Sequence, residues 1–177
     1  GGGGTSSSGP PLCGAVVTAA VGAQGRMLDA NVFQPASSMD QGPGIAHTHL
    51  LVWQGATSRA TGPSGLSPAQ VTGAYGVPSN SGSGAIAVID AFHDPNALSD
   101  FNTFSTQFGL PTEPSKNPLA ITNAVFQVVF AAACQPTTDA GWSQEIALDT
   151  QWAHAIAPKA KIFLVEAKSA TLGDLMA

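Results

Sequence analysis

From residue 66 onward, apolar runs typical of strands and amphipathic segments typical of helices follow one another along the chain. Runs of apolar and β-branched residues at Ala85–Asp90, Ala124–Ala133 and Lys161–Ala167 are typical of strands. Amphipathic segments of helical period separate these runs. The order strand–helix–strand–helix–strand predicts an α/β fold with a parallel sheet and covering helices. The unbroken apolar run of residues 162–165 further predicts a strand buried on both faces.

Capping residues mark where two of the helices should begin. Ser67 and Pro68 are suited to the N-cap and first position of a short helix, and Asp94 and Pro95 repeat this arrangement after the first strand. The second of these helices is predicted to carry its apolar side chains on one face. The residues of that face are Ala97, Phe101, Phe104 and Phe108.

A further helix is predicted to begin near Trp142 and to end before Pro158, whose ring removes a hydrogen-bond donor. On a wheel of ~100° per residue, Glu145 and Asp149 fall one turn apart in the middle of the apolar stripe. We therefore expect both carboxylates to face the protein. His154 falls on the opposite side of the wheel and is expected to face solvent.

Two acids on a core-facing stripe are costly to the folded state. An unpaired buried carboxylate is unfavourable by several kcal/mol, and acids at i and i+4 repel each other. A pair of carboxyl groups that share a proton is one functional reason to keep such an arrangement. A pair that caps or hydrogen-bonds a neighbouring loop is the structural alternative, and the residues alone leave both open.

The composition restricts the classes of partner. The chain has 177 residues, enough for one domain of ordinary size, and it contains only 6 Lys and Arg residues against 11 Asp and Glu. This balance argues against nucleic acid, which requires a basic surface, and against a polybasic membrane anchor. The low content of charged groups favours an extracellular, acidic setting. Cys13 and Cys134 are able to pair there, although two cysteines do not establish the redox compartment.

Residues 1–65 are predicted to be an irregular leader or linker. Gly1–Pro11 is of low complexity, and two short apolar stretches, Gly14–Val21 and Leu50–Trp53, are separated by Pro, Gly and Ser. His47 and His49 alternate as strand residues do, but two ligands are too few for a metal site, and an ordinary strand edge is the better interpretation.

Three segments resemble the sedolisins, the serine-carboxyl peptidases with a subtilisin-like fold, and the bacterial secreted members in particular. These segments are LSPAQVTGAY at 66–75, GAIAVIDAFHDPNALSDFNTFSTQFGL at 84–110 and GWSQEIALDTQWAHAIAPKAKIFLVEA at 141–167. The most specific part is the Glu-x-x-x-Asp pattern of Glu145 and Asp149, which Ala-Pro-x-Ala follows. The resemblance covers residues 66–177 and implies the first βαβαβ portion of a three-layer subtilisin-like domain, preceded by the end of a pro-segment or by a linker.

The resemblance implies a secreted endopeptidase that acts on protein or peptide substrates at acidic pH. Glu145 would then be the general base that accepts the proton of a serine nucleophile, and Asp149 would support it. The family's serine lies in a Gly-Thr-Ser motif, and its oxyanion-stabilising Asp also lies downstream. The one such triplet here, Gly4–Ser6, lies in the leader, and we discount it. The family's calcium site is likewise expected in a C-terminal remainder, so no cofactor is expected in this chain.

Other residues and functions stay open at this level. Asp90, at the end of the first predicted strand, is either a structural acid or a residue that supports the catalytic pair from behind. His93 is interpreted as an ordinary loop residue. The 177 residues alone are expected to be inactive, and an inactive binding module is the alternative function. A glycosidase is disfavoured because two acids on one helical turn seldom flank a sugar bond from opposite sides.

Overall fold

The computed structural model describes residues 9–14, 25–54, 65–78 and 80–177. Its centre is a parallel sheet in which β4 (Ala85–Ala91) and β5 (Phe126–Phe130) flank β6 (Lys161–Ala167), in the order β4-β6-β5. The predicted mixed α/β fold with a parallel sheet is therefore confirmed. The last strand has the predicted bounds, whereas the middle strand is shorter than the predicted Ala124–Ala133.

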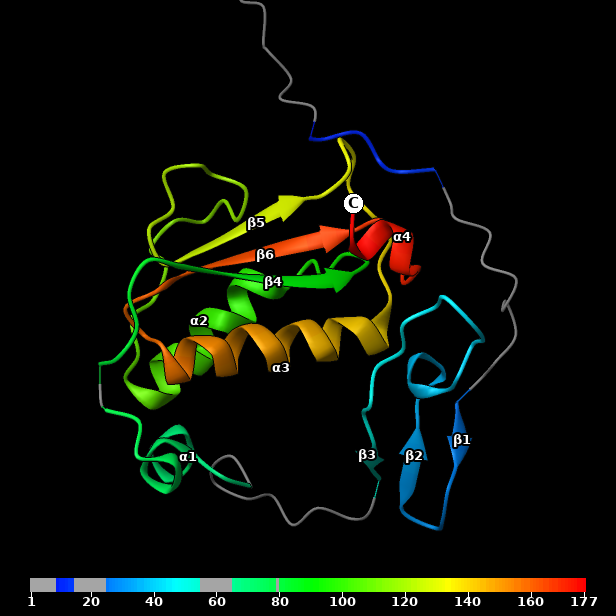
Figure 1. The fold of residues 1–177 in the computed structure, drawn as a ribbon, viewed down its shortest axis with the longest axis horizontal. Coiled ribbons are helices and arrows are strands. Elements are labelled where there is room, and N and C mark those ends of the chain that lie inside the picture. The colour runs from blue at the N-terminus through cyan, green and yellow to red at the C-terminus, as the bar shows by residue number, and fades with distance from the viewer. Residues whose placement is uncertain (1–8, 15–24, 55–64, 79) are drawn as a thin grey trace, which may run out of the picture.

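Two long helices, α2 (Ala97–Phe108) and α3 (Ala140–Ile156), lie on the same side of the sheet (Figure 1). The prediction that β6 is buried on both faces is wrong, because burial alternates along its length. The same alternation holds in β4, where Ile89 on the opposite face is 51% exposed. The apolar composition of these strands thus exceeds what the two helices cover.

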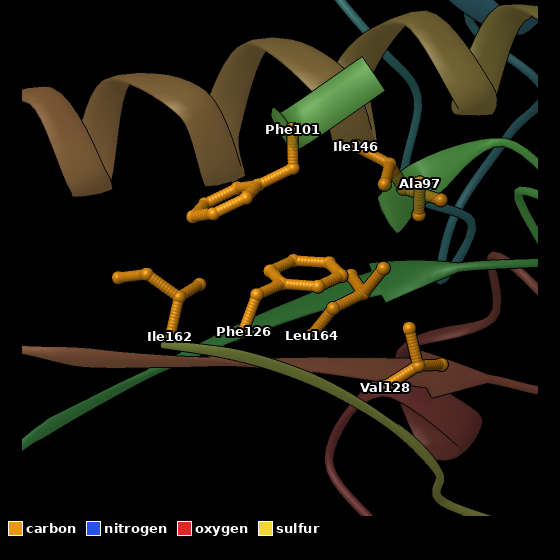
Figure 2. Close-up of a cluster of buried hydrophobic side chains, with 7 residues drawn as sticks. All are labelled: Ala97, Phe101, Phe126, Val128, Ile146, Ile162 and Leu164. Atoms are coloured by element: carbon orange, nitrogen blue, oxygen red, sulfur yellow. The ribbon is translucent and has the colours of Figure 1, made fainter. Parts of the chain in front are cut away.

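The core forms where these helices meet the sheet. Phe101 of α2 stacks on Phe126 of β5 with ring centroids 4.5 Å apart (Figure 2). Ile146 of α3 belongs to the same cluster as Ile162 and Leu164 of β6, and all three side chains are fully buried. Since aromatic stacking adds to the burial of large side chains, this cluster is the main source of stability in the domain.

The N-cap of α1 (Pro68–Tyr75) is confirmed, whereas the predicted N-cap of α2 at Asp94 is wrong, because Asn96 holds that position without a side-chain cap bond. Helix α1 has Ser67 as its N-cap with a reciprocal bond to Gln70, as Ser-Pro predicts. Helix α2 begins at Ala97, with Asn96 as its N-cap, slightly later than Asp94-Pro95 predicts. Asp94 still accepts a hydrogen bond from the amide of Asn96 at 3.0 Å, so it organises the turn before the helix. The short α4 (Leu172–Leu175) follows β6.

The described part of the leader is more regular than predicted. Strands β1 (Arg26–Met27), β2 (Val32–Gln34) and β3 (Val52–Trp53) form a small antiparallel sheet, and η1 (Ala36–Ser38) contacts α3. The predicted apolar stretch Gly14–Val21 lies outside the described residues apart from Gly14. The division of the chain at residue 65 stays a prediction.

A disulfide and a close backbone approach are among the connections that join the leader to the sheet domain. Cys13 and Cys134, which are 121 residues apart in the sequence, form a disulfide. The sequence alone left open whether these two cysteines pair. Ser37 approaches Gly141 at the start of α3 so closely that any Cβ there would collide with its hydroxyl. Glycine at position 141 is therefore required for this contact between η1 and α3.

One further buried acid organises the loop before β5. Glu113 is 3% exposed, and its carboxylate accepts hydrogen bonds from the amides of Ser115, Ala124 and Val125 at 2.8–3.1 Å. Burial by itself raises the pKa of Glu113, but these bonds and a longer one from Phe126 outweigh it, so the pKa is lowered. The loop is thus held by an ionised carboxylate.

None of the described helices is long and apolar enough to cross a membrane.

The core cluster generates a stability prediction with a matched control. Ile162→Ala removes a fully buried side chain and should lower the free energy of unfolding by about 2–5 kcal/mol, because it leaves a cavity between sheet and helices. Ile121→Ala removes the same atoms from a site that is 87% exposed, so its effect should stay within about 0.5 kcal/mol. Urea unfolding followed by circular dichroism measures both. Equal effects of the two substitutions would contradict the proposed core.

Candidate functional site

The two acids of α3 do not face the core as predicted. The buried side chains of the helix are Trp142, Ile146, Thr150, His154 and Ala155. Glu145 is half-buried and Asp149 is exposed, so both lie beside the buried face. The wheel placed the stripe wrongly because apolar residues surround much of this helix, and Leu148, which flanks the predicted stripe, is 44% exposed. Contacts with the sheet and with α2 select the face that is buried.

The prediction that His154 faces solvent is wrong for the same reason. His154 is fully buried, its ring lies 4.6 Å from that of Phe101, and its Nε2 lies 2.8 Å from the carbonyl oxygen of Pro111. Burial lowers the pKa of His154, and the bond to Pro111 opposes this only in part. His154 is therefore a neutral histidine of the core, and its hydrogen bond to Pro111 holds the loop after α2 in place.

Asp90 lies at the carboxyl end of β4 and belongs to the same group of acids as Glu145 and Asp149. It is 4% exposed, and its Oδ2 has no hydrogen-bond partner among the described residues. Burial and the nearby carboxylates of Asp149, Glu145 and Glu166, in that order, raise the pKa of Asp90 to about 7 from the ordinary 3.8. Strand β4 therefore brings a third carboxyl group to the pair on α3. These three residues are called the acid cluster below.

The two acids on α3 are also perturbed. Burial, and then the charge of Asp149, raise the pKa of Glu145, while His49 from the leader lowers it. Partial burial raises the pKa of Asp149. Neither carboxylate takes part in a side-chain hydrogen bond within the part of the chain that the structure describes, so the structural alternative of a satisfied cap finds no support here. Their oxygens are free to bind or transfer a proton.

A second buried acid lies beside the acid cluster, and sequence reasoning missed it. Glu166 of β6 is fully buried, its Oε2 lies 2.6 Å from Nδ1 of His93, and its Oε1 accepts from the amide of Asp94 at 3.2 Å. Burial raises the pKa of Glu166, while the hydrogen bond and charge of His93 lower it. His93 is therefore the partner of a buried acid and not an ordinary loop residue. The strand's period of two, which puts Glu166 on the same face as Ile162 and Leu164, was the available signal.

The backbone after β4 makes this pairing geometrically accessible. Phe92 has a φ of 68°, a left-handed conformation that is uncommon for a bulky residue. Its amide bonds the carbonyl of Ala167, and the amide of His93 bonds the carbonyl of Thr137. The chain therefore turns sharply at Phe92 and brings His93 to Glu166. Strain of this kind is common next to functional sites and costs of the order of 1 kcal/mol.

Part of the leader lies near the acid cluster. The rings of His47 and His49 lie 4.8 Å apart, and Thr48 between them is 1% exposed and bonds the hydroxyls of Ser37 and Ser38. Residues 25–54, 65–78 and 80–177 contain no group of at least three His, Cys, Asp or Glu side chains placed to hold a metal. His49 lies near enough to Glu145 to lower the pKa of that carboxyl group.

The geometry defines an α/β protein with carboxyl groups gathered at the carboxyl ends of a parallel sheet, the edge at which open α/β sheets place their ligands. No protein-family model, curated protein or solved structure matches the chain. The chemistry available to the acid cluster is proton transfer and hydrogen bonding, with the carboxyl group of Asp90 neutral at acidic pH because its pKa is about 7.

The raised pKa of Asp90 makes native stability depend on pH. The folded state favours its neutral form, so its contribution to stability is complete below the ordinary pKa of 3.8 and is lost as the pH rises through about 7. Between about pH 4 and about pH 8, the wild-type free energy of unfolding should fall by up to about 4 kcal/mol more than that of Asp90→Asn, which cannot ionise. Urea unfolding at both pH values measures the difference.

Asp40→Asn serves as the control, because Asp40 lies on an exposed turn and should leave the wild-type pH dependence unchanged. The carboxyl carbon of Asp90, followed by nuclear magnetic resonance, gives its titration directly. Parallel pH dependence in the wild type and in Asp90→Asn would show that this carboxyl group is not perturbed.

Proposed function

We propose that this chain provides the acid–base half of a serine-carboxyl endopeptidase site of the sedolisin kind. The observation that carries the proposal is the acid cluster: two carboxylates one helical turn apart, free of side-chain hydrogen bonds among the described residues, beside a third that is buried and unpartnered. Clusters in which burial and like charges perturb several pKa values occur preferentially at functional sites. The resemblance of residues 66–75, 84–110 and 141–167 supports the same assignment.

Glu145 is the general base of the proposed reaction. It accepts the proton of a serine hydroxyl while the serine oxygen attacks the peptide carbonyl, and it returns the proton to the leaving amine. A carboxylate base works near its own pKa, so the site operates at acidic pH. Its half-buried position lets it reach a group that approaches from solvent. The full burial predicted from the wheel would have obstructed that approach.

Asp149 and Asp90 position the base and adjust its pKa. Asp149 follows Glu145 by one turn, and its charge raises the pKa of Glu145. Asp90 is neutral at the acidic pH of the reaction, because its pKa is about 7. A neutral carboxyl group can donate a hydrogen bond, and it adds no negative charge beside Glu145 and Asp149. Asp90 is thus a positioning residue behind the pair.

The remainder of the proposal follows from the family resemblance. The sheet corresponds to the first part of a three-layer subtilisin-like domain, and the nucleophilic serine and the oxyanion Asp come from a C-terminal remainder of the same protease, where calcium is also bound. The substrate is a protein or peptide, and the enzyme is secreted. The Cys13–Cys134 disulfide is consistent with an oxidising compartment.

An inactive binding module is the second candidate function. The observation that favours it is the absence of any Gly-Thr-Ser triplet other than Gly4–Ser6 from the 177 residues. The two candidates differ in whether native material contains a polypeptide with that motif. Mass spectrometry of the native protein, intact and denatured, followed by peptide mapping, decides between them.

Peptide hydrolysis by the native material tests the role of Glu145. The peptidase should cleave an unfolded protein substrate at acidic pH, and Glu145→Gln should lower kcat by about 10²–10⁴-fold, because general-base catalysis contributes about that factor. The 177-residue chain alone should show no cleavage. Asp149→Asn should lower kcat less and shift the acidic limb of the pH profile, since it acts through Glu145.

Asp40→Asn is the matched control and should retain full activity, because this exposed acid lies outside the acid cluster. Full activity of Glu145→Gln would exclude Glu145 as the base. Native material without a Gly-Thr-Ser polypeptide and without acid hydrolysis would favour the binding module.

A further inference from the structure

A cleft of about 520 Å³ opens between α2 and α3, away from the acid cluster in the residues that line it. Its walls come from both helices and from Leu66, which precedes the N-cap of α1. The lining residues are Leu66, Asp100, Thr103, Phe104, Gln107, Phe108, Gln151 and Trp152. A volume of this size is within the range of small-molecule sites.

Aromatic rings form the apolar part of this cleft. The centroid of Phe104 lies 4.8 Å from that of Phe108 and 6.3 Å from that of Trp152, and both pairs are tilted by 57°. All three side chains are half-buried, so they are anchored in the helix pair while part of each stays open to the cleft. Tilted rings from two helices present π faces from different directions, as the walls of an aromatic cage do.

The charge of the cleft is complementary to a cation. Asp100 precedes Phe104 by one turn of α2, so the helical repeat puts its exposed carboxylate on the same side as the rings. No Lys, Arg or His lines the cleft among the described residues. An anion would face both Asp100 and the negative faces of the rings, whereas a cation is attracted by both.

We infer that this cleft is a binding site for an alkylated ammonium group, of which trimethylammonium is the simplest case. Its methyl groups contact Phe104, Phe108 and Trp152, and its charge is balanced by Asp100. A quaternary ammonium suits half-open rings because it is weakly hydrated and donates no hydrogen bond, so it requires no acceptor inside the cleft. The inference is independent of the proposed peptidase, since no residue of the acid cluster lines the cleft.

Comparing choline with its neutral isostere 3,3-dimethylbutan-1-ol distinguishes the contribution of the positive charge to binding from that of molecular shape. The indole N–H resonance of Trp152, followed by nuclear magnetic resonance during titration of the wild-type chain, should shift with choline and saturate. The alcohol should bind at least about tenfold more weakly, because it keeps the methyl groups but has no charge. Equal binding of the two compounds, or no shift of Trp152 with choline, would overturn the inference.

Variants identify the groups responsible. Asp100→Asn, at an exposed position, should weaken choline binding several-fold and leave the alcohol unchanged, whereas unchanged choline binding would contradict the charge argument. Trp152→Leu keeps an apolar side chain and should weaken choline binding about tenfold, as measured by calorimetry. Trp53→Leu, at a site that is 62% exposed and outside the cleft, is its matched control and should bind choline as the wild type does.

The source of the ammonium group follows from a parallel titration. A short peptide that contains trimethyl-lysine carries the same group on a polypeptide. Binding of this peptide at least as tight as that of choline indicates a modified protein as the ligand, and preference for choline indicates a small metabolite. Both results support the site, and failure of both probes to bind refutes it.

Discussion

The burial of one face of the sheet under α2 and α3 is the interaction on which the rest of the structure depends. Phe101 stacks on Phe126, and Ile146 closes over the centre of β6. Because both helices lie on this face, the carboxyl ends of β4 and β6 are brought beside the first half of α3. The acid cluster is a consequence of this packing: Asp90 comes from the strand and its neighbours come from the helix, and no local sequence preference joins them.

Three buried carboxyl groups of the domain, those of Glu113, Glu166 and Asp90, have different surroundings. The structure accommodates these groups in three ways. Glu113 is ionised and satisfied by backbone amides, Glu166 is paired with His93, and Asp90 is neutral at acidic pH because burial and its acidic neighbours raise its pKa to about 7. These environments give one kind of side chain different pKa directions within a single small domain. At acidic pH, the protonation of Asp90 and of Glu166 therefore stabilises the folded state, whereas the protonation of Glu113 destabilises it.

The leader contacts the domain near the acid cluster, although its composition predicts only an irregular segment. Gly141 allows Ser37 to touch the start of α3, Ala46 bonds the backbone of Ala170, and His49 lies near Glu145. The leader thus contacts α3 and the segment that follows β6. Together with the Cys13–Cys134 disulfide, these contacts fix the leader against the domain whose proposed catalytic acids it borders.

The sequence by itself determined the order of strands and helices from residue 66 onward, the cap at Ser67 and the bounds of β6, because these depend on local period and turn chemistry. Tertiary structure alone decided which face of α3 is buried. Apolar residues surround much of that helix, so only its contacts with the sheet and α2 exclude water from Ile146 and His154 and leave Asp149 exposed. It also decided the pairing of His93 with Glu166 and the raised pKa of Asp90, since burial and charge at these residues come from segments distant in the chain.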